Sequence, residues 1–150
     1  MANRVENMLT EELVASLQEE RYVTIATVDH ETGGPNVNAI SWIYAINEQT
    51  VRFAVDSKSR ILTNIREQPL VTVTVIADGS TFSMSGRAKV MKDSMENVSL
   101  RLGMVELTVS EVRDVMFYGA RLTSEPKFEK TYDLEAAEKL DKQVMHALKQ

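Results

Sequence analysis

The sequence predicts a mainly β fold, a small closed or half-closed antiparallel barrel with helices only at its ends and in its connections. Several separate runs alternate apolar and polar side chains, a pattern that is typical of strands. Turn signals such as "ADGS" (77–80) join neighbouring runs, which favours hairpins over parallel strands linked by crossover helices. Because an open antiparallel sheet leaves unpaired edges, closure into a barrel is the economical arrangement.

Size and composition fit one globular domain. The chain has 150 residues, of which 43% are hydrophobic and 26% charged, and it contains no low-complexity segment. We therefore expect a single domain that spans residues 1–150.

Charge and residue types exclude several classes of function. The 22 acidic residues outnumber the 17 Lys and Arg, and the net charge of -5 disfavours nucleic acid and acidic membranes as partners. The absence of cysteine excludes disulfides and thiolate metal sites and fits a reducing compartment. No run is long enough to span a membrane, and the opening "MANRVENMLTEELV" lacks the apolar stretch of a signal peptide. These observations predict a cytoplasmic protein.

The first thirty residues predict a helix and a strand. Leu9, Leu13 and Leu17 recur at every fourth position, which indicates a short amphipathic helix. The run "YVTIATVD" (22–29) is rich in β-branched residues and leads into "HETGGP" (30–35). We expect a strand followed by a turn.

A hairpin is expected next. The run "NVNAISWIYAIN" (36–47) predicts one long strand, and both of its faces should be largely covered because both carry apolar residues. The turn "NEQ" then leads into "TVRFAVD" (50–56), in which Val51, Phe53 and Val55 share a face. These two runs are expected to pair with each other.

The middle of the chain predicts a helix and a second hairpin. A short helix should form around Ile61 and Ile65 and end before Pro69. The runs "LVTVTVIAD" (70–78) and "TFSMSGRAKVMK" (81–92) then alternate on either side of a tight turn, which is the pattern of a hairpin.

The last third is less regular. Residues 94–103 are expected to be helical or irregular, and residues 104–122 fit either one bent strand or two short strands. A C-terminal helix should pack against the barrel through one apolar stripe. The stripe consists of Leu134, Ala137, Leu140, Val144 and Leu148.

Hydroxyl groups and positive charge gather at the start of the middle helix, in Ser57, Lys58, Ser59 and Arg60. The first N–H groups of a helix are unpaired and carry partial positive charge, so this segment could bind a phosphate. The planar fork of arginine suits that role. Equally, one serine could act only as a helix cap while the basic residues are solvated. The local pattern leaves both interpretations open.

The order of these elements resembles the pyridoxamine 5'-phosphate oxidase-like family of flavin-binding split β-barrels. The resemblance rests on a hairpin, then "SKSRILTNIREQP" (57–69), then a valine-rich strand and a strand with "SGRAKV" (85–90). It covers roughly residues 8–92 and is strongest over 50–90. It implies a six-stranded antiparallel split β-barrel, FMN as cofactor, and a homodimer with the flavin at the subunit interface.

Residue by residue, the resemblance also implies a flavin site. Ser59 and Arg60 match the family's Ser-Arg pair, whose arginine binds the FMN phosphate. The lysine that follows in the family is Ile61 here, so Lys58 would have to supply that charge. Thr81 stands where the oxidases carry a flavin-contacting glutamine. The complete set of expected cofactor-binding residues is Ala39, Ile40, Ser41, Trp42, Val55, Asp56, Ser57, Lys58, Ser59, Arg60 and Thr81.

Other positions depart from the true oxidases. Ala39 and Tyr44 stand where those enzymes have an arginine and a lysine, and the C-terminal tryptophan- and arginine-containing substrate segment is missing. Vitamin B6 oxidation is therefore not expected. On residue types alone, Trp42 could line a flavin or belong to the core.

Three functions follow from the resemblance. The first is an FMN-dependent oxidoreductase that acts on a small molecule, with catalytic residues unassigned because FMN supplies the redox chemistry. The second is a non-catalytic flavin-binding, storage or stress-response protein. The third is a related barrel that holds haem or a deazaflavin, for which only His30 and His146 could offer an imidazole ligand. No metal site is expected from two isolated histidines.

Overall fold

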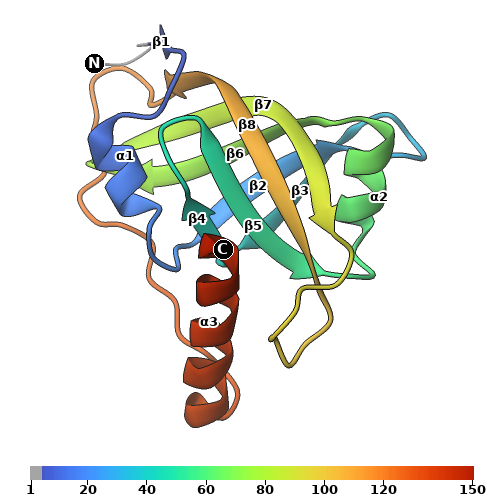
Figure 1. The fold of residues 1–150 in the computed structure, drawn as a ribbon. Coiled ribbons are helices and arrows are strands. Elements are labelled where there is room, and N and C mark those ends of the chain that lie inside the picture. The colour runs from blue at the N-terminus through green and yellow to red at the C-terminus, as the bar shows by residue number, and fades with distance from the viewer. Residues whose placement is uncertain (1–4) are drawn as a thin grey trace.

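The computed structural model describes residues 5–150, which form three helices and one sheet of eight strands (Figure 1). The helices are α1 (Glu11–Ser16), α2 (Arg60–Glu67) and α3 (Leu134–Lys149). The strands are β1 (Val5–Glu6), β2 (Val23–Val28), β3 (Pro35–Ile40), β4 (Ile43–Ala45), β5 (Thr50–Asp56), β6 (Leu70–Ala77), β7 (Ser80–Lys92) and β8 (Leu102–Asp114). All pairings are antiparallel.

The sheet rolls into a half-open barrel because its two ends are tied together. The strand order is β3-β2-β6-β7-β8-β5-β4, and β1 pairs with β8 outside this path. Although β3 and β4 stand at opposite ends of that order, only Ser41 and Trp42 separate them in the chain. The step from Ile40 to Ile43 reaches at most about 11 Å, so the sheet has to curl until its ends are close. The expected split β-barrel is confirmed.

The prediction of one long strand over 36–47 is wrong. The run breaks at Ser41 and Trp42, and its halves pair with different neighbours, β3 with β2 and β4 with β5. The expected hairpin therefore forms only between β4 and β5. β3 and β4 correspond to one expected strand, and the two-residue β1 was not expected. The remaining described strands match the other five expected strands, so six were expected and six are found when β3 and β4 are counted together.

The expectation that both faces of this run are covered is also wrong for β3. That strand pairs only with β2, so it lies at the edge of the sheet, and Val37 is 62% exposed. Alternation of residue types is the same in an edge strand and a central strand, so it could not show where the chain leaves the sheet. β4 meets the expectation better, with Ile43 and Ala45 buried.

The second hairpin and its continuation fit the sequence prediction. β6 and β7 pair from Leu70 to Ala77, and the turn between them has positive φ at Asp78 (51°) and Gly79 (75°), as a type I′ hairpin turn requires. Residues 94–101 are irregular. β8 is one strand that ends at Asp114, so residues 115–122 are not part of it.

A bulge bends β8 against β7. Ser85 pairs with Glu111 and Gly86 pairs with Val109, so the chain has one extra residue, Ser110, on β8. This bulge explains the polar interruption in the sequence and favours the single bent strand over two short ones. A side chain at position 86 would collide with the carbonyl group of Thr108.

Two hydrophobic clusters hold the helices to the barrel. The larger cluster fills the barrel, and α1 and α2 cover its opposite ends through residues such as Leu13 and Leu62 (Figure 1). The smaller cluster joins α3 to the outside of β5 and β8, where Leu140 and Val144 pack with Met104. The apolar stripe expected for α3 is buried except for Leu134, which begins the helix and is 71% exposed.

The bulge predicts the result of substituting Gly86. In Gly86→Ala the added methyl carbon lies 2.9 Å from the carbonyl carbon of Thr108, so the strands have to separate locally. We expect the free energy of unfolding, measured by urea titration, to fall by about 1–3 kcal/mol. Gly34→Ala is the control, because its new carbon meets only the Thr32 hydroxyl at 3.4 Å. Equal stability of the two variants would contradict the packing argument.

Candidate functional site

A cleft of about 410 Å³ opens where β3 and β5 meet the segment that precedes α3. β3 and the crossover after it supply one wall, the end of β5 supplies another, and the start of α2 contributes Ser59 and Ile61. The lining residues are Asn38, Ala39, Ile40, Ser41, Trp42, Ala54, Val55, Asp56, Ser59, Ile61, Lys130 and Tyr132. Its size lies within the range of small-molecule sites.

Most of the residues expected from the sequence lie together in this cleft. Seven of them line it, namely Ala39, Ile40, Ser41, Trp42, Val55, Asp56 and Ser59. Ser57, Lys58 and Arg60 follow β5 closely but do not line it. Thr81 lies on β7, which β2 and β6 separate from β3, so it is not part of this cleft.

The start of α2 is capped by its own residues. The Ser59 hydroxyl accepts a hydrogen bond from the Ile61 N–H at 3.1 Å, and the Asp56 carboxylate accepts one from the Lys58 N–H at 2.8 Å. Ser59 is thus a helix cap, which was one of the two roles that the sequence left open for this segment, the other being phosphate binding. Its hydroxyl proton is not used in that bond, so the cap and a phosphate contact are compatible. Ile61 is 3% exposed and belongs to the barrel core.

Arg60 reaches from α2 to the turn between β2 and β3. Its Nη1 donates to Asp29 Oδ1 at 2.8 Å, and its Nη2 lies 3.7 Å from Glu31 Oε1. The Arg60 side chain is 52% exposed, whereas the side chain of Asp29 is 7% exposed. The guanidinium group is therefore held beside the helix start and still accessible to solvent.

Asp29 is stabilised as a carboxylate. Its pKa falls from 3.8 to about 2, chiefly because the backbone N–H of Thr32 donates a hydrogen bond to it. Burial by itself would raise the pKa, but hydrogen bonds from the Glu31 N–H, the Thr32 hydroxyl and Arg60 lower it further. The bond from the Thr32 N–H is 2.9 Å long. Asp29 is therefore ionised at neutral pH and orients both the turn and Arg60.

The sequence did not predict the contribution of Lys130 and Tyr132. Lys130 Nζ donates to Glu20 Oε2 at 2.6 Å and to Asp141 Oδ1 at 2.9 Å. Burial alone would lower the pKa of Lys130, but these hydrogen bonds and the charges of both carboxylates raise it above its ordinary value. Both residues lie in an irregular segment far along the chain, so no periodicity or motif could have indicated them.

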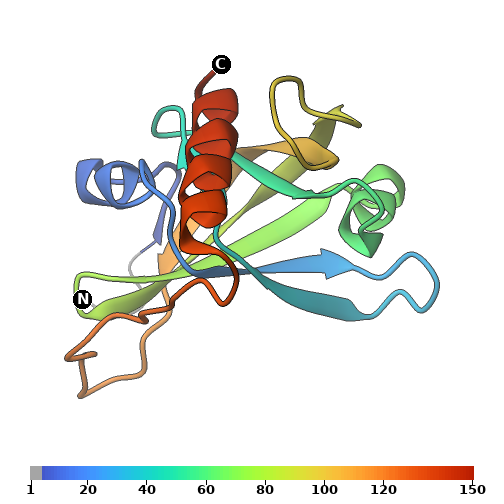
Figure 2. The ribbon, with the colours of Figure 1, turned by 90° about the horizontal axis from the view of Figure 1, so that it is seen from below.

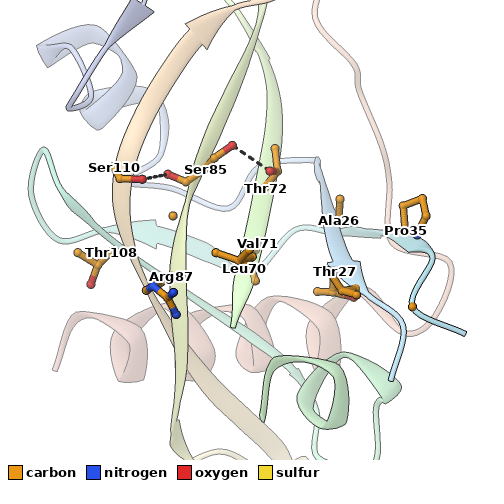
Figure 3. A pocket seen from close by; sticks show the side chains of 13 residues that line it. Ala26, Thr27, Pro35, Leu70, Val71, Thr72, Ser85, Arg87, Thr108 and Ser110 are labelled. Carbon is orange, nitrogen blue, oxygen red and sulfur yellow. Dashed lines mark hydrogen bonds between the residues drawn. The ribbon is translucent and has the colours of Figure 1, made fainter. Parts of the chain in front are cut away.

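A second and larger groove, of about 910 Å³, lies on the outer face of β2, β6, β7 and β8 (Figure 3). Small side chains dominate it, and Ser85 lies between Thr72 and Ser110, bonded to Thr72 at 2.9 Å and accepting from Ser110 at 3.2 Å through its carbonyl. Arg87 is its one charged side chain among the described residues that line it. None of the expected site residues lines this groove.

The two histidines lie in different parts of the fold. Within residues 5–150, no three His, Asp or Glu side chains lie together in a way that could hold a metal ion. His30 contacts Asn64 through Nδ1 at 2.7 Å in the β2–β3 turn, and His146 lies on α3. Neither histidine lines the 410 Å³ cleft. Across the same residues, no helix combines the length and apolar character needed to cross a bilayer.

Comparison with known proteins gives one family match. The family model described as pyridoxamine 5'-phosphate oxidase matches residues 9–117. No curated protein matches the chain.

Several solved structures share the fold. A candidate pyridoxamine 5'-phosphate oxidase from Lactobacillus delbrueckii is 24% identical, with a TM-score of 0.61 over 75% of this chain and 98% of its own. General Stress Protein 26 from Bacillus anthracis is 17% identical, with a TM-score of 0.56 over 68% of this chain and 89% of its own. An F420 reductase is 18% identical, with a TM-score of 0.55 over 65% and 93%. At these identities the likeness concerns the fold alone.

The carboxylate of Asp29 predicts a pH-dependent contribution to stability. A carboxyl whose pKa is lower in the folded chain stabilises it fully above its unfolded pKa, and that contribution is lost as pH falls towards the folded pKa. For Asp29 the loss should occur between about pH 4 and about pH 2. We expect Asp29→Asn to unfold at lower urea concentration than the wild type near pH 6, with the difference shrinking as pH falls through this window. A difference that stays constant with pH would contradict the assignment.

Proposed function

The chain belongs to the pyridoxamine 5'-phosphate oxidase family, and on this premise we propose that it binds FMN in the 410 Å³ cleft and acts as an FMN-dependent oxidoreductase on a small molecule. The observation that carries the proposal is that seven of the eleven site residues expected from the resemblance line one cleft. Residues from β3, β5 and the start of α2 contribute, and they come together only through the rolled sheet.

The phosphate would lie at the start of α2. Ser59 can donate its hydroxyl proton there, and Arg60 can offer N–H groups beyond those that contact Asp29, because its fork carries five donors. Lys58 is exposed and close in sequence, so it can add charge in place of the lysine that Ile61 replaces. Asp29 would fix the orientation of Arg60, and the N–H groups that do not contact Asp29 would face the phosphate.

The ring system would lie towards the crossover between β3 and β4. Ala39 and Ile40 offer extended backbone and small or apolar side chains there, and Trp42 offers an aromatic wall. FMN supplies hydride and single-electron chemistry when it is bound. The residues of this chain would hold the ring, exclude water from one side and control which molecules reach it.

The substrate is not expected to be vitamin B6. Ala39 carries no charge, and Tyr44 packs beside α3 with Lys149 Nζ 5.4 Å from its ring centroid, so neither residue can reproduce the cations of the true oxidases. Among the described residues that line the cleft, only Asp56, Lys130 and Tyr132 are titratable, and Lys130 is already bonded to two carboxylates. Electron or hydride transfer from FMN therefore fits the cleft better than acid–base catalysis by side chains.

A homodimer is part of the proposal. The outer groove of about 910 Å³ is lined mostly by uncharged residues, and Leu70, which lines it, is 49% exposed. Val37 is the cross-strand partner of Ala26 and faces the same side. Such a surface fits a second copy of the chain, and Thr81 could meet a flavin only if that flavin were held by the partner. A cytoplasmic location accords with the cysteine-free composition.

The first test is titration of the purified protein with FMN and with riboflavin, followed by the same titrations of Arg60→Ala. Loss of a charge-assisted phosphate contact should weaken FMN binding by about 1.5–3 kcal/mol, tenfold or more. Riboflavin has no phosphate, so its affinity should not change. Arg66→Ala is the matched control, since Arg66 stands at the far end of the same helix and pairs with Asp93.

Three results would count against the proposal. Failure of the wild type to bind FMN would remove the cofactor assignment, and equal FMN affinity in Arg60→Ala would remove Arg60 as the phosphate anchor. The third result concerns turnover, which is measured as oxidation of NADH or NADPH by the FMN-loaded protein and would support an enzyme if observed. Stable flavin binding with no turnover on any donor would favour the non-catalytic alternative.

The second test concerns the outer groove. Ala26→Arg places a long charged side chain on the groove surface (Figure 3), and we expect it to convert a dimer into a monomer by light scattering, with an unchanged circular dichroism spectrum. Ala136→Arg, on the exposed side of α3, makes the same substitution elsewhere and should leave the dimer intact. A dimer that survives Ala26→Arg would place the interface elsewhere.

A further inference from the structure

One wall of the candidate site comes from beyond the region that the family model matches. The match ends at residue 117, and the chain continues through an irregular segment before α3 begins at Leu134. Figure 2 shows this segment running along the outside of the barrel to the start of α3. Lys130 and Tyr132 belong to it, and both line the cleft.

Lys130 joins two parts of the chain that are far apart in sequence. Glu20 lies in the stretch between α1 and β2, and Asp141 lies on α3. The Lys130 ammonium group binds both carboxylates, at 2.6 and 2.9 Å, and its side chain is 20% exposed. A pair of partly buried carboxylates so close to one nitrogen depends on that nitrogen, because the two negative charges would otherwise repel each other.

The same two carboxylates hold the residues of the crossover. Ser41 Oγ donates to Glu20 Oε2 at 2.5 Å, and Trp42 Nε1 donates to Asp141 Oδ1 at 2.9 Å. Lys130 Nζ also lies 5.6 Å from the centroid of the Trp42 ring, within the range of a cation–π contact. Lys130 therefore contacts the indole ring directly and shares the Asp141 carboxylate with it.

We propose that Lys130 is a positioning residue for the aromatic end of the cleft, where it bridges Glu20 and Asp141 and so fixes Trp42 as the wall for a planar ligand ring. The part of this inference that concerns the ligand rests on the proposed FMN site. Trp42 faces the cleft while its indole N–H is bonded on the side of α3. Loss of the bridge would free the indole to move and would loosen the surface that the ring contacts.

Trp42 is the only tryptophan in the chain, so its fluorescence reports on this wall alone. The experiment compares the wild type with three variants: Lys130→Met keeps the aliphatic stem without the charge, Lys130→Arg keeps the charge, and Lys127→Ala is an exposed control in the same segment. Two quantities are measured for each, the quenching of Trp42 by acrylamide without FMN and the affinity for FMN.

We expect Lys130→Met to increase acrylamide quenching and to weaken FMN binding about tenfold, the effect of one lost ordering contact. Lys130→Arg should restore both quantities towards the wild-type values, and Lys127→Ala should match the wild type. If Lys130→Met does not fold, as judged by circular dichroism, Asp141→Leu removes the oxygen that accepts from both Lys130 and Trp42 and should give the same two changes.

The outcomes separate this inference from the proposed function. Unchanged quenching in Lys130→Met, or equal behaviour of the Met and Arg variants, would overturn the positioning role. Increased quenching with unchanged FMN affinity would overturn its link to the ligand, while FMN binding itself stands. A wild type that fails to bind FMN would overturn the proposed function, and the FMN-free quenching would still decide whether Lys130 holds Trp42.

Discussion

Two residues, Ser41 and Trp42, carry the chain from one end of the sheet to the other, and the rest of the structure depends on this short crossover. β3 pairs only with β2, and β4 pairs only with β5, so a flat sheet would leave them at opposite edges with five strands between them. Two intervening residues cannot cover that distance, and the sheet has to roll. The rolled sheet then brings the end of β5 beside β3, which creates the cleft.

The sequence predicted the elements better than it predicted their arrangement. Local signals suffice where a local rule decides the structure, as at the Asp78–Gly79 turn and in the apolar stripe of α3. The break at Ser41 could not be predicted in this way, because apolar and polar residues alternate across it without interruption. Only the choice of partner strand, a long-range property, distinguishes β3 from β4.

The candidate site shows the same division. Residues that lie on a strand or directly after one, such as Ala39 and Asp56, could be predicted from the resemblance to a known family, and they line the cleft. Arg60 was expected to face a ligand, whereas its nearest partner is Asp29, 31 residues earlier in the chain. Lys130 comes from an irregular segment, and its role depends on contacts with Glu20 and Asp141 that no sequence pattern encodes.

The two hydrophobic clusters have a consequence for how this chain can change over time. They share no buried residue, and they meet at β5, where Val55 belongs to the barrel cluster and its neighbour Ala54 to the α3 cluster. Because successive side chains of β5 point to opposite faces of the sheet, the two clusters lie on opposite sides of this strand. Substitutions of the apolar residues of α3 can therefore accumulate without disturbing the barrel interior, whereas changes at Lys130 or Asp141 would reach the cleft through Trp42.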